Sequence, residues 1–97
     1  MAETIVQGNL RGTLLAAFVL PDETGMQIGR QVELRNISRQ VNLLPEYVVC
    51  ITSVHSREMA SWDSGDYSST YEAAMVDFAE RVFRAMGRHD LKVVTNA

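Results

Sequence analysis

Apolar and polar residues follow a β-strand pattern in the first half of the chain. Residues 13–20 form a continuous apolar run that ends at Pro21, which is typical of a strand buried on both faces. A short buried helix is the alternative, because periodicity does not separate the two in a run of this length. Residues 26–35 then alternate between apolar and polar with period two, which predicts a half-buried strand. A short turn containing Gly25 joins the two runs, so they are predicted to form a β-hairpin.

Further strands are predicted later in the chain and near both of its ends. Residues 46–54 are mostly β-branched or aromatic, and they give the strongest strand signal in the sequence. Residues 40–44 are predicted as a short strand that leads into Pro45. Residues 4–7 and 91–95 are predicted as terminal strands, which we expect at the sheet edges.

Residues 70–86 carry the pattern of one amphipathic helix. Ser69 is the expected N-cap, and Glu72 three residues later would complete a capping box. Gly87 is the expected left-handed residue at the C-terminal end. The apolar face repeats every three or four residues and comprises Tyr71, Ala74, Met75, Phe78, Val82 and Met86. The predicted fold class is therefore α+β: a mostly antiparallel sheet of four or five strands covered by one long C-terminal helix.

Length and charge limit the classes of protein that this chain can belong to. The 97 residues suit a single domain, 1–97, and the formal net charge of −3 argues against nucleic-acid binding, which needs a basic surface. No apolar run reaches the roughly 18 residues that span a membrane. The single cysteine cannot form an internal disulfide, and the N-terminus lacks the pattern of a signal peptide, so the cytoplasm is the expected location.

The segment 55–68 is the first candidate for function, because it is predicted as a long connecting loop and holds the only tryptophan. It overlaps an acidic stretch, residues 58–80, that contains no Lys or Arg. A protein partner with a basic surface is therefore expected. Aromatic residues flanked by charges are typical interface anchors. The predicted partner-binding residues are Glu58, Met59, Trp62, Asp63, Asp66 and Tyr67. The alternative is that Trp62 folds back onto the core and the segment only connects two elements.

Catalytic, metal and cofactor patterns are missing from the sequence. Cys50 lies within an apolar strand, where a thiol is inert, and the His, Asp and Glu spacings match no metal-ligand pattern. No metal, cofactor or catalytic residue is therefore predicted. The hypothesis is a non-catalytic interaction module, an adaptor or inhibitor of the kind that bacterial phages and mobile elements carry. The alternative is a small-molecule-binding domain or small enzyme whose pocket is shared in a homodimer and lined by His55, Arg57, Asp63 and Tyr67.

Overall fold

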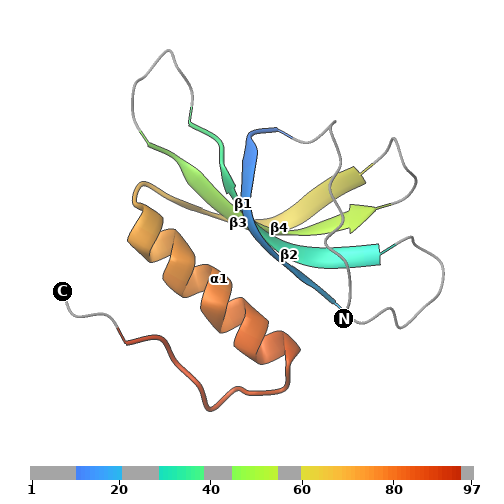
Figure 1. The fold of residues 1–97 in the computed structure, drawn as a ribbon, viewed down its shortest axis with the longest axis vertical. Helices are drawn as coiled ribbons and strands as arrows, with labels where there is room; N and C mark the ends of the chain where they lie inside the picture. Colours follow the sequence, from blue (N-terminus) through green and yellow to red (C-terminus); the bar gives the residue numbers. More distant parts are fainter. Residues whose placement is uncertain (1–10, 21–28, 39–44, 55–59, 95–97) are drawn as a thin grey trace.

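The computed structural model describes residues 11–20, 29–38, 45–54 and 60–94. In this part of the chain, four antiparallel strands form one sheet in the order β1-β2-β3-β4, and helix α1 lies against it (Figure 1). The elements are β1 Thr13–Val19, β2 Gly29–Asn36, β3 Tyr47–Val54, β4 Ala60–Ser68 and α1 Tyr71–Ala85. The predicted α+β fold with one helix on the sheet is confirmed.

The hairpin predicted from the first two apolar runs is present, but its first strand is less buried than expected. Strand β1 pairs antiparallel with β2, and the register shifts between Leu14 and Ala16. That irregularity leaves Leu15 exposed to 43%. The prediction that this run is buried on both faces was wrong: its residues are exposed or half-buried, and among the described strands β1 pairs with β2 alone, at the end of the sheet.

Strand β4 corrects the prediction of a long loop over residues 55–68. Residues Ala60–Ser68 form a strand that pairs antiparallel with β3. Ser, Asp and Gly dominate this segment, and these residues disfavour strands in isolation. The strand forms here beside the hydrophobic strand β3, with a bulge on β4 between Asp63 and Asp66.

Helix α1 matches its prediction to within one residue at each end. The N-cap is Thr70 rather than Ser69, and its hydroxyl accepts a hydrogen bond from the backbone N–H of Ala73 at 3.2 Å. Glu72 therefore lies in the first turn, where its negative charge interacts favourably with the helix dipole, but it is not at the capping-box position. Gly87 has a positive φ of 76°, and the Arg88 N–H bonds to the Phe83 carbonyl at 2.8 Å, which closes a Schellman motif.

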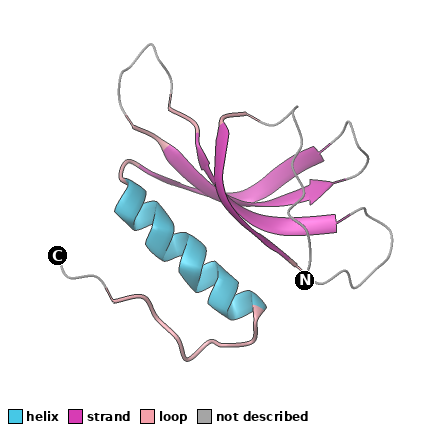
Figure 2. Cartoon of the chain, in the orientation of Figure 1, coloured by secondary structure: helices cyan, strands magenta, loops and turns pink. Residues whose placement is uncertain are grey.

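Helix α1 covers one face of the sheet, as Figure 2 shows, and the main core lies between them. The buried residues of this core are Val32, Leu34, Val49 and Ala74, and Met75 and Phe78 of the helix pack against them. The predicted apolar face extends too far at both ends of the helix. Tyr71 is 49% exposed and Met86 is 57% exposed, because the helix ends project beyond this core.

Several other expectations concern the ends of the chain. The predicted strand 91–95 was wrong over residues 91–94, where the structure shows no strand. The predicted strands 4–7 and 40–44 lie outside the described residues. Across the described ranges, no helix has the length and apolar character needed to cross a membrane.

Candidate functional site

Strand β4 divides the predicted partner-binding residues between the two faces of the sheet. Asp66 pairs with Val49 of the helix-covered core, and Asp63 pairs with Ile51 on the same face. Trp62 pairs with Thr52 and Tyr67 pairs with Val48, on the face that α1 leaves uncovered. The remaining predicted site residues, His55, Arg57, Glu58 and Met59, lie outside the described residues.

Trp62 behaves as part of a second, smaller core. Its half-buried side chain packs against a cluster of Ile37, Val48 and Cys50 on the helix-free face. The guanidinium carbon of Arg35 lies 5.9 Å from the centre of the indole ring, within the range of a cation–π contact. This packing supports the alternative that Trp62 folds back onto the protein.

Strand β4 presents three of the predicted residues to solvent: Tyr67, Asp63 and Asp66. Tyr67 is 58% exposed, and Asp63 is also exposed. A Cβ atom at Gly65 would lie 3.4 Å from the Tyr67 ring and 3.3 Å from a Val48 methyl group. A glycine at this position therefore leaves room for the Tyr67 ring beside Val48.

Asp66 forms an ion pair with Arg81 of the helix. Arg81 also contacts Asp77, at 3.7 Å from Nε to Oδ1. The hydrogen bond and charge of Arg81 hold the pKa of Asp66 below its usual range. Burial raises the pKa of Asp77, and the neighbouring carboxylate of Asp66 adds to this increase. Asp66 and Asp77, two acids of the stretch 58–80, therefore both pair with Arg81. The surface around them is less negative than the stretch 58–80 alone indicates.

A groove of about 480 Å³ opens between the C-terminal half of α1 and the sheet. Its apolar walls come from Leu20 directly after β1, from β2 and β3, and from the helix, and its charged groups come from β4 and the helix. The lining residues are Leu20, Val32, Ile51, Asp66, Arg81, Arg84 and Ala85. Of the residues predicted for a ligand pocket, Asp63 and Tyr67 lie on opposite faces of β4 and do not converge.

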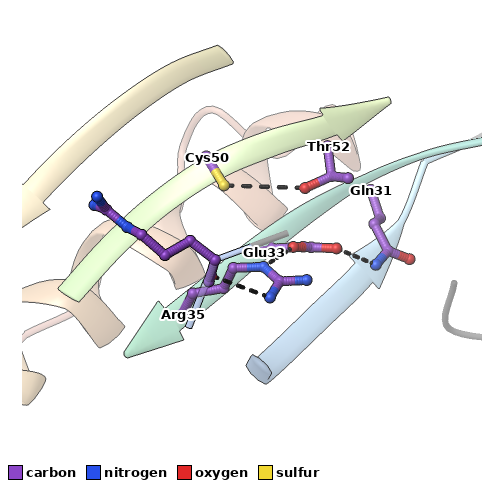
Figure 3. A network of polar contacts seen from close by, with 6 residues as sticks. Gln31, Glu33, Arg35, Cys50 and Thr52 are labelled. Carbon is purple, nitrogen blue, oxygen red and sulfur yellow. Dashed lines mark hydrogen bonds and ion pairs between the residues drawn. The ribbon is translucent and has the colours of Figure 1, made fainter. Parts of the chain in front are cut away.

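A buried polar row on β2 was missed by the sequence analysis. Gln31, Glu33 and Arg35 are all buried on the helix-free face, so β2 is buried on both faces and not on one. Figure 3 shows Glu33 between the other two side chains. Its carboxylate accepts hydrogen bonds from Gln31 Nε2 and from Arg35 Nε, each at 2.5 Å. The signal for this row was the three long polar residues at period two, which were interpreted as a solvent-facing side.

Cys50 lies next to this row on β3 and is unsuited to nucleophilic chemistry. Its Sγ atom is 4.0 Å from the hydroxyl of Thr52 (Figure 3). Burial raises the pKa of the thiol to about 11, so the thiol is neutral near pH 7. Among the described residues, no three His, Cys, Asp or Glu side chains converge as metal ligands would.

Comparisons with known proteins found no matching family model, no matching curated protein and no matching solved structure.

Proposed function

We propose that this protein is a non-catalytic protein–protein interaction module that binds a basic, extended segment of its partner along strand β4. The observation that carries the proposal is that β4 ends the sheet, with β3 as its one strand neighbour among the described residues. The free edge of such a strand offers backbone N–H and C=O groups to an added strand. Edge addition is therefore the binding mode that this fold favours.

The exposed side chains of β4 suit such a partner. Tyr67 supplies an aromatic anchor, and Asp63 supplies a negative charge that no ion pair neutralises in the described part of the chain. Asp66 contributes less, because it already pairs with Arg81. A segment that alternates basic and apolar side chains would place each kind on one face of the extended sheet.

The cytoplasm is the compartment that we propose for this interaction. Cys50 is a free, buried thiol, which suits a reducing environment. A second copy of the chain could also pair along β4, so the mass in solution must be known before any partner is tested. Light scattering after size exclusion supplies that mass.

A synthetic peptide of ten alternating Lys and Val residues provides a defined probe, and its Glu–Val counterpart is the control. We expect the Lys–Val peptide to shift the backbone amide NMR signals of β4, with little effect from the Glu–Val peptide. Tyr67→Ala should weaken binding by tenfold or more, because an aromatic anchor at an interface commonly carries at least 2 kcal/mol. Asp63→Asn should slow association mainly at low salt.

Asp90→Asn is the matched control, because Asp90 is an exposed acid in the segment after α1 and is paired with Arg88. It should leave peptide binding unchanged. Equal binding of both peptides, or amide shifts that avoid β4, would contradict the proposal. In cells, a partner that is captured by the wild type and Asp90→Asn but lost with Tyr67→Ala would support it.

A further inference from the structure

The groove beneath the C-terminal half of α1 has the size and lining of a small-molecule site. Its volume of about 480 Å³ lies within the roughly 300–1,000 Å³ typical of ligand pockets. Leu20 directly after β1, Val32 of β2 and Ile51 of β3 give it an apolar surface. This lining suits the hydrocarbon part of a ligand.

The charged residues of the groove have an excess of positive charge. Of the described residues, Arg81, Arg84 and Asp66 are the charged ones that line it, so two cations face one anion there. Arg81 is already held by Asp66 and Asp77. Arg84 is exposed in the last turn of α1 and makes no ion pair within the described ranges. Its guanidinium is therefore available to a carboxylate or phosphate group.

We infer that this groove binds a small amphipathic anion, whose apolar body lies on Leu20, Val32 and Ile51 and whose carboxylate pairs with Arg84. Charge complementarity selects this class of ligand, because a cation would meet Arg81 and Arg84, and a neutral molecule would leave Arg84 without a partner. This site differs from the β4 edge proposed for a protein partner, although Asp66 belongs to the same strand. Binding at one site does not require binding at the other.

Octanoate is a simple probe of this chemistry. Octyl glucoside, which is neutral, and octylammonium, which is cationic, carry the same alkyl chain and are its controls. We expect octanoate to shift the amide NMR signals of Ile51, Arg84 and Ala85, and the two controls to bind at least several-fold more weakly. Equal binding of all three compounds would show a nonspecific apolar surface and would overturn the inference.

Two variants locate the site. Ala85→Trp adds a large side chain at an exposed helix position that lines the groove, and it should abolish octanoate binding. Ala73→Trp makes the same change in the exposed first turn, outside the groove, and should have no effect. Arg84→Gln should weaken binding about three- to fivefold, as expected for an exposed ion pair, whereas Arg88→Gln should not. Octanoate affinity that survives both Ala85→Trp and Arg84→Gln would refute the site.

Asp66→Asn separates this inference from the proposed partner function. Removing the negative charge of Asp66 from the lining of the groove should tighten octanoate binding. The same change removes an acid from β4 and should weaken binding of the Lys–Val peptide or leave it unchanged. Loss of octanoate binding in Asp66→Asn, with the melting temperature preserved, would contradict the groove while leaving the β4 proposal standing.

Discussion

Replacing Glu33 tests how much the buried polar row contributes to stability. The side chains of Glu33 and Arg35 are 0% and 3% exposed, so the ion pair between them has almost no contact with water. Glu33→Leu keeps a similar side-chain volume but leaves the guanidinium of Arg35 buried without its carboxylate. Breaking a buried pair from one side in this way costs about 3–5 kcal/mol.

The surroundings of Arg35 offer little compensation for that loss. Its Nη1 makes a long hydrogen bond of 3.4 Å to the carbonyl of Arg11, and its Nη2 has no hydrogen-bond partner among the described residues. The guanidinium carbon of Arg35 lies 5.9 Å from the centre of the Trp62 ring, and this cation–π contact contributes about 0.5–2 kcal/mol both in the wild type and in Glu33→Leu. Because a domain of this size is stable by about 5–15 kcal/mol in total, Glu33→Leu should remove a large fraction of its stability.

Urea unfolding of four proteins measures the effect as a double-mutant cycle. The four are the wild type, Glu33→Leu, Arg35→Met and the double variant, which has no buried charge at either position. The double variant should be more stable than Glu33→Leu alone, because apolar replacement of a whole buried pair is often neutral or stabilising. Gln31 loses the same acceptor in Glu33→Leu and in the double variant. A cost below about 1 kcal/mol for Glu33→Leu would refute this account of the row.

Two further predictions concern Trp62 and Asp77. Trp62→Ala should lower the free energy of unfolding by about 2 kcal/mol, less than the 3–5 kcal/mol of a fully buried aromatic, and urea unfolding should show no such loss in Tyr67→Ala. Because the pKa of Asp77 is raised in the folded state, the folded protein holds that proton more tightly than the unfolded chain. Its contribution to stability therefore falls as pH rises above the ordinary value of 3.8. Asp77→Asn should remove this fall in urea titrations between about pH 4 and pH 7, and an unchanged pH dependence would contradict the assignment.

The elements with strong local signals were predictable from the sequence. Strand β3 is rich in β-branched residues, and α1 repeats its apolar residues every three or four positions and ends at Gly87. These signals reflect the backbone preferences of the residues themselves together with their burial on one side. They predicted the α+β class and the helix ends to within one residue, and the two apolar runs joined at Gly25 predicted the β1–β2 hairpin.

The features that depend on distant neighbours were not predictable. Strand β4 consists largely of residues that disfavour strands, and it is a strand because β3 lies beside it. Asp66 and Arg81 are 15 residues apart, and no local pattern indicates their ion pair. The groove likewise needs three strands and the end of α1 at once. The candidate site could therefore be traced to β4 by its aromatic and acidic residues, but its division between two faces could not.

The buried row on β2 also disfavours shifted pairings of β2 with its neighbouring strands. Side chains alternate between faces, so a slip of one residue would move Glu33 and Arg35 into the main core and Val32 and Leu34 out of it. The charged pair makes such a slip costly, whereas the Glu33→Leu, Arg35→Met double variant is apolar on both faces over this stretch. We therefore expect the double variant to remain folded but to sample more than one β2 pairing, with duplicated or broadened amide NMR signals for β1 and β3. A single sharp set of signals would show that the hairpin and the rest of the core set the register without the charges.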